Sequence, residues 1–437
     1  MASTGLSRTC TQGNNKTATL SVWLKRAGGF GSEQYILGFG LVAGAYTQIS
    51  FNSSDNINVY NFSGGGVLDI RSYAKRRDPA AWLHFCVAFD SSQNTESNRI
   101  KYYINGTQVT GSDLDVNYPA LNADCVFNNN GQPCTVGMNN SSSGYYNGSM
   151  AMMEWVDGLQ LDPTYFGSFD SASGIWTPTA TSTISDYGVN GFKLAMDTST
   201  PGADTSGNTN NFTVGAGTPT LTQGSPSNVF ATMNPLIPGQ TNYTYSNGNL
   251  TITQGSSAWV KSNSTIGMSS GKYYWEAKYV SGLYTVVGVD KTDTATPYPS
   301  TSSSAVGWKR NGNVEVGTTP QTDIASYAHG DIVSVALDMD NACVYFGKGG
   351  VWQNSGDPTS GASKTGAYSL PSYVANTPYF ATVSPYESGA TSMNFGEGFF
   401  GTTAAGTQAD DNGQGLFAYD VPAGYYALNT KNLEAYG

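Results

Sequence analysis

The stretch TATLSVWLK at residues 17–25 decides the fold class of this chain. Its apolar and polar side chains alternate with a period of two, as in a β-strand with one buried face. Three further runs, each bounded by Gly, Asn, Ser or Asp, lie at residues 82–89 (WLHFCVAF), 99–105 (RIKYYIN) and 271–280 (GKYYWEAKYV). No long stretch repeats apolar residues at helical spacing. The sequence therefore predicts an all-β protein with under roughly a tenth helix.

The composition agrees with this prediction. Hydrophobic residues make up 39% of the 437 residues, enough for a core, whereas charged residues reach only 12%, well below the usual share of about 25%. Polarity comes instead from Ser, Thr, Asn and 53 Gly, and the aromatic residues include 28 Tyr. Because aromatic residues favour strands and Gly, Asn and Ser favour tight turns, we expect antiparallel β-sandwiches.

The order of these signals divides the chain into four parts. We expect a β-sandwich at residues 1–168, an extended Ser/Thr/Gly/Pro-rich connector at 169–245 that is mostly packed down, a second β-sandwich at 246–400 and a loop-rich tail at 401–437. Further strands are expected at residues 45–52, 56–61, 148–155, 191–196, 249–254, 284–290, 305–310, 332–338, 343–346 and 378–384. Asn105-Gly106 is suited to a primed hairpin turn.

Charge and cysteine content limit the expected partners. Twenty basic and 31 acidic residues give a net charge of −11, and without a basic patch no nucleic-acid partner is expected. No apolar run approaches the ~20 residues of a spanning helix, and no signal-peptide pattern is visible, so we expect a soluble protein without membrane insertion. Cys125 and Cys134 flank a polar loop and could form a disulfide, although an odd count of five cysteines fits poorly with a disulfide framework.

Ordered motifs in the first half of the chain carry a family resemblance. They are Arg77-Asp78-Pro79-Ala80-Ala81-Trp82, Ser97-Asn98-Arg99-Ile100-Lys101, Tyr103-Ile104-Asn105-Gly106, Asn147-Gly148, Asp157-Gly158, Leu161-Asp162-Pro163, Gly174-Ile175-Trp176-Thr177-Pro178 and Asp204-Thr205-Ser206-Gly207-Asn208. This order resembles the concanavalin A-like (laminin G/pentraxin-type) domain of virion and tail-fibre proteins from tailed bacteriophages. The resemblance implies a jelly-roll sandwich for the first domain.

The second half of the chain is similar to SPRY domains. The motifs are Ser269-Ser270-Gly271-Lys272-Tyr273-Tyr274-Trp275-Glu276, Gly330-Asp331-Ile332-Val333-Ser334-Val335-Ala336-Leu337-Asp338-Met339-Asp340 and Asn394-Phe395-Gly396. This resemblance implies a second sandwich that binds partners through loops at one end. SPRY domains usually carry Gly after the Asp-Asn pair of one hairpin. Here Ala342 follows Asp340-Asn341, so we expect Asn341 to take the left-handed conformation instead.

Together the two resemblances imply a non-enzymatic bacteriophage surface protein, tail- or fibre-associated, that adheres to a host-surface glycan. The expected location is the virion surface, after synthesis in the host bacterial cytoplasm. The expected partners are other virion proteins, further copies of the chain in a homo-oligomer and the glycan. The alternative is a structural decoration or assembly protein of the virion with no ligand of its own. No collagen-like, coiled-coil or β-helical shaft is visible, so the chain is expected to be a compact module attached to a larger structure.

The residues that could hydrolyse a glycoside are not arranged for it. Glu154 and Asp157 are three residues apart in a predicted strand, so their side chains point to opposite faces. They therefore cannot flank one bond at the ~5–5.5 Å that a retaining mechanism requires. His84 lies in an alternating strand and His329 in a turn, neither beside the partners of a triad or a zinc site. We expect no catalytic residue, no metal site and no enzyme activity.

Exposed aromatic rings beside amide side chains are the sugar-binding candidates. A ring stacks on the apolar face of a sugar, and amides read its hydroxyl groups. The candidate carbohydrate-binding residues are Tyr145, Tyr146, Asn147 and Asn139 in a loop of the first domain, and Trp352 and Tyr298, with Trp308 beside them, in the second. The alternative for each ring is packing in the core or between sheets.

Calcium is the one cofactor that the resemblance leaves open. Laminin G-like domains often bind Ca²⁺ through loop carboxylates, and Asp55, Asp113, Asp115 and Asp124 lie in predicted loops. Ca²⁺ takes about six to eight oxygen ligands from a compact constellation, which the spacing of these residues does not define. Ordinary solvated turns are the alternative.

Overall fold

The chain forms two compact units, unit 1 (Met1–Leu221) and unit 2 (Thr222–Gly437). The computed structural model describes residues 4–41, 44–63, 66–179, 183–197, 199–240, 242–295, 298–299 and 301–437. Within these residues, helix is limited to α1 (Thr430–Tyr436) and to short 3₁₀ turns at Glu96–Asn98, Gly111–Asp113, Pro163–Tyr165 and Pro358–Ser363. The all-β prediction is confirmed.

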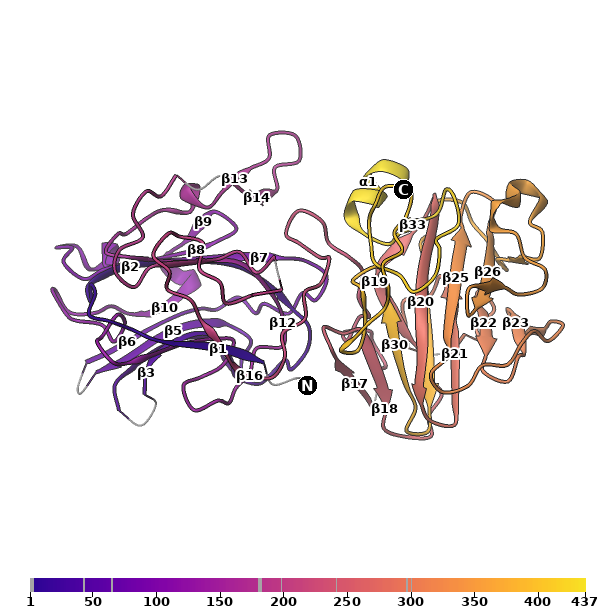
Figure 1. The fold of residues 1–437 in the computed structure, drawn as a ribbon, viewed down its shortest axis with the longest axis horizontal. Coiled ribbons are helices and arrows are strands. Elements are labelled where there is room, and N and C mark those ends of the chain that lie inside the picture. The colour runs from indigo at the N-terminus through magenta and orange to yellow at the C-terminus, as the bar shows by residue number, and fades with distance from the viewer. Residues whose placement is uncertain are drawn as a thin grey trace. The chain divides into compact units, whose positions relative to one another are not determined.

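Unit 1 is a sandwich of two antiparallel sheets, drawn as two layers in indigo to magenta in Figure 1. The first sheet contains, in spatial order, β10 (Leu114–Asn117), β6 (Gly66–Ser72), β5 (Ile57–Ser63), β4 (Tyr46–Phe51), β3 (Gln34–Gly40), β11 (Pro133–Val136), β1 (Gly5–Thr9) and β16 (Thr213–Ala216). The second contains β15 (Phe192–Leu194), β12 (Gly148–Asp157), β2 (Thr17–Arg26), β7 (Leu83–Asp90), β8 (Ile100–Ile104) and β9 (Thr107–Val109). A separate hairpin joins β13 (Gly167–Phe169) to β14 (Trp176–Pro178).

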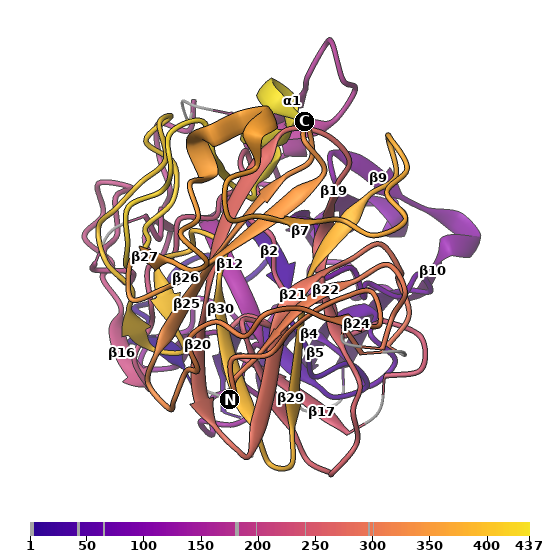
Figure 2. The same ribbon diagram turned by 90° about the vertical axis from the view of Figure 1, so that its right-hand side faces the viewer.

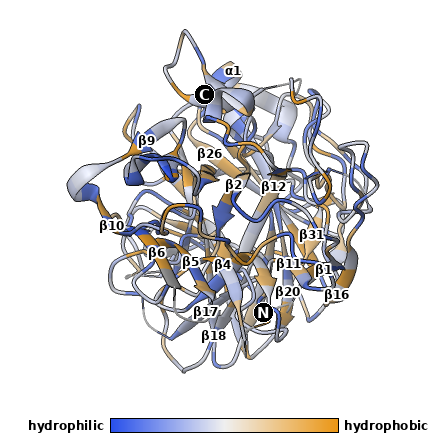
Figure 3. Cartoon of the chain, turned by 90° about the vertical axis from the view of Figure 1, so that its left-hand side faces the viewer, coloured by the Kyte–Doolittle hydropathy of each residue, from blue (hydrophilic) through white to orange (hydrophobic). Residues whose placement is uncertain are grey.

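The alternation that predicted β2 has an unusual outcome, because both of its faces are buried. Leu20 and Val22 face the core between the sheets and have no exposed surface. On the other face, Trp23 packs against the ring of His84 (5.0 Å between centroids), and His84 in turn stacks on Trp176 of β14. The β13–β14 hairpin therefore covers the outer face of the second sheet. In Figure 3, hydrophobic segments in orange occur along strands such as β6 and β1.

Unit 2 is a second sandwich, and Figure 2 shows its two layers. The first sheet contains β17 (Tyr243–Ser246), β18 (Thr251–Gln254), β30 (Ala390–Asn394), β20 (Lys272–Ser281), β25 (Ile332–Asp338), β26 (Cys343–Lys348) and β27 (Val351–Trp352), with β28 (Tyr368–Ser369) beside β26 and β33 (Tyr426–Ala427) beside β20. The second contains β19 (Ser262–Met268), β29 (Tyr379–Tyr386), β21 (Tyr284–Asp290), β22 (Val306–Lys309), β23 (Val314–Val316) and β24 (Thr319–Pro320). A short hairpin joins β31 (Phe399–Phe400) to β32 (Thr403–Ala404).

Strand β20 is also covered on both faces. Trp275 lies in the core between the sheets, whereas Tyr274, on the outer face, belongs to a second buried cluster with Phe417 and Tyr425. The Tyr274 and Phe417 rings meet edge to face, with centroids 5.0 Å apart. The last residues of the chain, expected to be a loop-rich tail, therefore form the cover of this sheet, and they end in α1.

Residues 169–245, expected to be an extended connector, are divided between the units. β14, β15 and β16 belong to the sheets and the hairpin of unit 1, whereas Phe230 and Met233 are buried in clusters of unit 2. Segments of this stretch are therefore ordered because they pack on the sandwich of unit 1 or on that of unit 2.

Two expectations about turns have opposite outcomes. Asn105 (φ 46°) and Gly106 (φ 75°) both have positive φ and join β8 to β9, so the primed-turn prediction is confirmed. The prediction for Asn341 is wrong, because the left-handed residue is Ala342, with φ 53°. The Asn341 side chain and N–H instead donate hydrogen bonds to Asp338, both at 2.8 Å. These bonds hold Asn341 in place, so the left-handed conformation falls on Ala342.

Candidate functional site

One wall of a surface pocket in unit 2 is the β26–β27 hairpin. Its turn contains Gly349 (φ 59°) and Gly350 (φ 80°), conformations that glycine adopts without steric cost. The turn pairs Trp352 with Gly347. A Cβ on Gly347 would lie 3.2 Å from the Trp352 ring, so the absence of a side chain lets the half-exposed indole lie close to the strand.

The opposite wall is the segment 418–422, which is fixed by the buried Glu276 of β20. The Oε1 atom of Glu276 accepts hydrogen bonds from the backbone N–H groups of Ala418 (3.0 Å) and Tyr419 (2.9 Å). Burial raises the pKa of Glu276, and these hydrogen bonds partly oppose the rise. A Cβ on Gly350 would lie 3.0 Å from the Tyr419 ring, so the two walls meet at this glycine.

The third wall is the start of the 3₁₀ turn Pro358–Ser363. Asp357 caps this turn: its Oδ1 accepts hydrogen bonds from the N–H (2.9 Å) and the hydroxyl (2.6 Å) of Thr359. The buried hydroxyl of Tyr425 donates to the carbonyl of Pro358 (3.1 Å). The rim is therefore tied to the cover of the sheet.

These three walls border an open surface pocket of about 580 Å³, within the ~300–1,000 Å³ of small-molecule sites. The lining residues are Gly350, Trp352, Gly356, Asp357, Pro358, Thr359, Gln408, Ala418, Tyr419, Asp420, Val421 and Pro422. They combine two aromatic rings with carboxylate, amide and hydroxyl groups, which is the chemistry needed to stack on a polyhydroxylated ligand and to hydrogen-bond with it.

The structure brings only Trp352 of the sequence candidates into this pocket. The residues that sequence reasoning missed are Asp357, Gln408, Tyr419 and Asp420. They lie in segments without strand periodicity, and three of them lie in the stretch expected to be a tail. The adjacent Tyr419-Asp420 pair after the buried Phe417 was the one available signal.

The other two candidate rings of unit 2 have different surroundings. Trp308 is completely buried in the core, as its alternative interpretation expected. Tyr298 is half-exposed and stacks on Trp259, with centroids 4.8 Å apart and an angle of 22° between the planes. Trp259 also stacks on Tyr386, with centroids 4.3 Å apart, so the Tyr298 ring belongs to an aromatic cluster of its own chain.

In unit 1, the two tyrosines of the candidate loop differ. Tyr146 packs on Phe51 (6.2 Å between centroids) and its buried hydroxyl has no hydrogen-bond partner. Burial raises the pKa of this hydroxyl. Tyr145 is half-exposed, and its hydroxyl donates to the carbonyl of Ser142 (2.7 Å). Both residues are half-exposed, but Tyr146 packs against the core, so Tyr145 is the better candidate for a stacking ring.

The two asparagines of this loop hold its shape. The side-chain oxygen of Asn139 accepts hydrogen bonds from the N–H groups of Ser141 and Ser143, both at 2.9 Å. The backbone of Asn147 accepts from Ala27 (2.9 Å) and donates to the side chain of Gln34 (3.1 Å). Both asparagines are buried.

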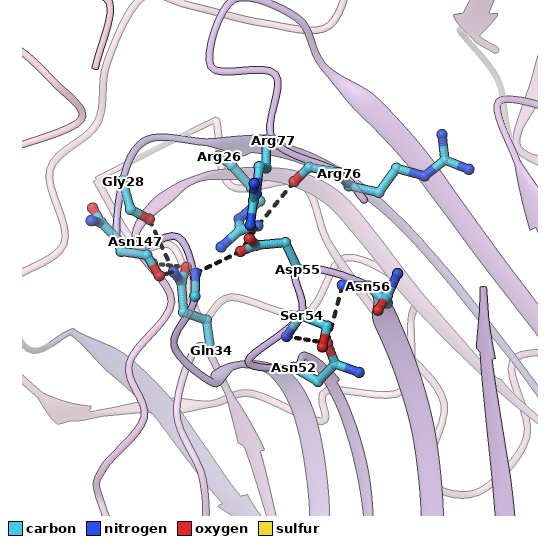
Figure 4. Close-up of polar contacts among 12 residues, drawn as sticks. Arg26, Gly28, Gln34, Asn52, Ser54, Asp55, Asn56, Arg76, Arg77 and Asn147 are labelled. Atoms are coloured by element: carbon cyan, nitrogen blue, oxygen red, sulfur yellow. Dashed lines mark hydrogen bonds and ion pairs between the residues drawn. The ribbon is translucent and has the colours of Figure 1, made fainter. Parts of the chain in front are cut away.

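Beside this loop lies a buried network centred on Asp55 (Figure 4). Oδ1 of Asp55 accepts hydrogen bonds from Arg26 and from the N–H of Gly31, both at 2.9 Å, and Oδ2 pairs with Arg77. Burial alone would raise the pKa of Asp55, but Gly31 and the two guanidinium groups hold it below the ordinary value. The Arg26 guanidinium also lies over the Phe51 ring, 4.3 Å from its centroid.

Three of the four carboxylates considered for calcium lie beside basic side chains. Asp55 is bound to arginines, Asp115 pairs with Arg71, and the exposed Asp124 lies 3.9 Å from Lys16. Within the described residues, no group of three or more His, Cys, Asp or Glu side chains gathers as metal ligands would.

The first of the two histidines is enclosed by unit 1. The Trp176 indole N–H, which can only donate, bonds to Nδ1 of His84 (3.0 Å), so Nε2 carries the proton and donates to the Ser21 hydroxyl (2.8 Å). Burial lowers the pKa of His84 to about 3. The second histidine, His329, lies in a turn, and its Nε2 contacts the carbonyl of Gly282 (2.9 Å).

The carboxylates of Glu154 and Asp157 have separate partners. Glu154 is bonded to Tyr187 and Lys193. Asp157 accepts hydrogen bonds at 2.8–2.9 Å from the N–H groups of Asn14 and Asn190 and from the side-chain amide of Asn128. Burial raises the pKa of Asp157, and the bonds from Asn190 and Asn14 oppose the rise.

The disulfide between Cys125 and Cys134 is not formed, since all five cysteines are free and buried. Cys134 instead has a side-chain hydrogen bond with Cys10. Cys10 directly follows β1, which pairs with β11, the strand that contains Cys134. Within the described residues, no helix has the length and apolar character needed to cross a membrane.

Solved structures that match part of this chain include SPRY domains. The SPRY domain of human HERC1 is 20% identical, with a TM-score of 0.31, and the match covers 37% of this chain and 96% of that one. The TRIM65 PSpry domain is 13% identical, with a TM-score of 0.29, and covers 38% of this chain and 91% of that one. Stonustoxin is 15% identical over 38% of this chain and 27% of its own, with a TM-score of 0.28.

Sequence comparison adds a result for unit 1. No curated protein sequence matches the chain. A family model does match: residues 3–159, most of the unit 1 sandwich, are similar to the concanavalin A-like lectin/glucanases superfamily.

Proposed function

We propose that this chain is a non-enzymatic surface protein of a tailed bacteriophage, tail- or fibre-associated, that attaches the virion to a host-surface glycan. The ligand binds in the unit 2 pocket between Trp352 and Tyr419. Unit 1 is a lectin-like module that contributes to attachment or links the protein to its neighbours in the virion, among them further copies of the chain.

The pocket is the observation that carries this proposal. A sugar ring offers an apolar face and a rim of hydroxyl groups, so its binding site needs a ring to stack on and polar groups around it. Trp352 and Tyr419 supply the rings, and Asp357, Gln408 and Asp420 supply the polar groups. The 418–422 wall is fixed by the buried Glu276 rather than by the ligand, so little ordering cost of this wall accompanies binding.

Two further observations support the proposal. The superfamily matched by residues 3–159 is named for lectins and glucanases, and the ordered motifs of the first half resemble the concanavalin A-like domain of phage virion proteins. The carboxylates of Glu154 and Asp157 are bonded to separate partners and His84 is enclosed, which supports binding without hydrolysis.

A second candidate function is assembly or decoration of the virion. Its support is the β13–β14 hairpin, whose tip carries Phe169 (54% exposed) and Ile175 (63% exposed). Apolar side chains at an exposed tip are stabilised when another subunit covers them. In this function the hairpin contacts a neighbouring virion protein and the unit 2 pocket has no ligand.

Binding of the whole protein to an array of bacterial surface glycans, with Trp352→Ala and Tyr419→Ala variants, tests the first function. We expect either variant to lower affinity about two- to tenfold, because an aromatic contact contributes roughly 0.5–1.5 kcal/mol. Tyr145→Ala is the matched control, since it removes a half-exposed ring from unit 1. Circular dichroism checks the fold of each variant.

Four outcomes contradict the proposal. Binding that is lost only in Tyr145→Ala places the site in unit 1, and binding that survives all three substitutions removes the pocket from the function. If no glycan binds, and a Phe169→Ser/Ile175→Ser double variant no longer labels virions in immuno-electron microscopy, assembly is the function. Polysaccharide cleavage that disappears in Glu154→Gln would contradict the non-enzymatic part.

A further inference from the structure

The sign of the charge around the unit 2 pocket is uniform. Among its twelve lining residues, two are carboxylates, Asp357 and Asp420, and none is Lys, Arg or His. A carboxylate at the rim repels an anionic ligand and attracts a cation. A pocket for an acidic sugar would need the opposite charge.

Both carboxylates keep free acceptors. Asp420 is exposed, and no hydrogen bond or ion pair joins its side chain to the described residues. In Asp357, Oδ1 accepts both bonds from Thr359, which leaves Oδ2 toward solvent. Neither carboxylate is required by the fold to neutralise a charge of the chain.

The lysine of the hairpin wall does not neutralise the pocket carboxylates. Lys348, two residues before Gly350, is bonded through Nζ to Asp331 (2.9 Å) and to the carbonyl of Ser326 (2.8 Å). Lys348 therefore pairs with Asp331 and with neither pocket carboxylate.

The aromatic rings favour the same ligand charge. The faces of Trp and Tyr carry negative potential and attract a cation. Trp352 and Tyr419 with two carboxylates thus form a site for an ammonium group. Gln408 and the Thr359 hydroxyl add donors and acceptors for neutral hydroxyl groups, and a volume of about 580 Å³ exceeds what an ammonium group alone would fill.

We infer that the ligand of this pocket is an amino sugar with a free, protonated amine, rather than a neutral, N-acetylated or acidic sugar. This inference rests on the proposed glycan-binding function and names its ligand class. The ammonium group binds between Asp357 and Asp420, the sugar ring stacks on Trp352 or Tyr419, and the hydroxyl groups bond to Gln408 and Thr359. No bond is made or broken.

Calorimetry with the whole protein tests this inference. The probes are a glucosamine tetrasaccharide, the same tetrasaccharide fully N-acetylated, and a galacturonic acid tetrasaccharide, at a pH that keeps the amine protonated. We expect the free-amine probe to bind at least about tenfold more tightly than the N-acetylated probe, with an affinity that falls as salt rises. The acidic probe is expected not to bind.

Charge-neutral variants locate the effect. Asp420→Asn and Asp357→Asn should each reduce the preference for the free amine several-fold and flatten its salt dependence. Asp323→Asn is the control, because it removes the same charge from an exposed unit 2 position outside the lining, where Asp323 accepts a hydrogen bond from Asn313 (3.1 Å). It should leave the preference unchanged.

The outcomes separate this inference from the proposed function. Equal or tighter binding of the N-acetylated or acidic probe overturns the inference and leaves glycan binding in place. A preference for the free amine that survives both pocket variants, or that Asp323→Asn abolishes as well, also overturns it. Tighter binding of a lysine peptide than of its acetylated form, with no oligosaccharide bound, overturns the sugar assignment. If no glycan of the array binds either, the proposed function fails too.

Discussion

Each unit contains a buried carboxylate that fixes loops, and the two are built differently. Asp55 in unit 1 is bound by the cationic side chains of Arg26 and Arg77 as well as by one N–H group. Glu276 in unit 2 is bound by neutral groups, two of them the backbone N–H groups of Ala418 and Tyr419. The pKa of Asp55 is accordingly lowered, and that of Glu276 is raised.

This difference shows that a buried carboxylate can hold side chains of several loops together, or can fix the backbone of one loop and leave its side chains exposed. The arginines that neutralise Asp55 come from two segments, so the network draws loops of unit 1 together. Glu276 holds a single segment by its backbone and leaves the side chains of Tyr419 and Asp420 free to line a pocket. The two networks should therefore respond differently to substitution and to pH.

The largest effect is expected from Asp55→Asn. The substitution leaves the buried Arg26 without its counter-charge, and breaking a buried ion pair in this way costs about 3–5 kcal/mol. Hydrogen exchange should show lost protection in peptides of unit 1, with unit 2 unaffected. Asp115→Asn is the control, since its pair with Arg71 is exposed and contributes at most about 1 kcal/mol. Equal effects of the two variants would show that the Asp55 network is dispensable.

Glu276→Gln should cost up to about 3 kcal/mol, because an amide NH₂ group then faces backbone donors that need an acceptor. Protection should fall in residues 417–419, and ligand affinity should fall with it. The raised pKa adds a second signature: folding favours protonated Glu276, so this group makes unit 2 more stable as pH falls from its folded pKa towards the unfolded value. The variant should lack that gain. Unchanged protection in this segment would contradict the positioning role.

His84 should make unit 1 sensitive to mild acid. Its folded pKa is about 3, below the unfolded value of ~6.5, so the unfolded state alone takes up a proton as pH falls below the unfolded value. The contribution of neutral His84 to the free energy of unfolding is fully present above the unfolded pKa. Below that pKa the free energy of unfolding decreases by about 1.4 kcal/mol per pH unit, or by about 2 kcal/mol at pH 5. The denaturant midpoint of unit 1, followed by exchange from pH 7 to 5, measures this loss. A His84→Gln variant with the same pH slope would refute the assignment.

The smallest effect concerns two hairpin turns. Ala342→Gly should stabilise unit 2 by up to about 1 kcal/mol, because it relieves the left-handed conformation of an alanine. The reverse change in unit 1, Gly106→Ala, should destabilise, since the new Cβ would lie 2.3 Å from the Trp176 ring at φ 75°. Thermal melting of both variants gives the comparison. A lower melting temperature for Ala342→Gly would mean that the turn is unstrained.

The sequence alone determined the fold class and most of the central strands. Period-two runs such as 17–25 and 271–280 became β2 and β20, because alternation reflects burial of one face and needs no distant partner to be recognised. Asn105-Gly106 was predictable for the same local reason. Strands β3, β19 and β30 were missed, since they lie in runs whose burial depends on neighbours in the sheet rather than on alternation.

Tertiary structure alone decided the candidate site. Trp352 could be chosen from the sequence as a ring, but Tyr419 lies far along the chain in a stretch without periodicity, and it reaches the pocket because Glu276 binds its N–H group. Tertiary structure also decided the surroundings of Tyr146. Its sequence neighbours suggested an exposed ring, whereas the ring packs on Phe51. Local sequence records the preference of each residue for a strand or a turn, whereas hydrogen bonds and burial between distant segments decide which polar groups are used by the fold and which remain free for a ligand.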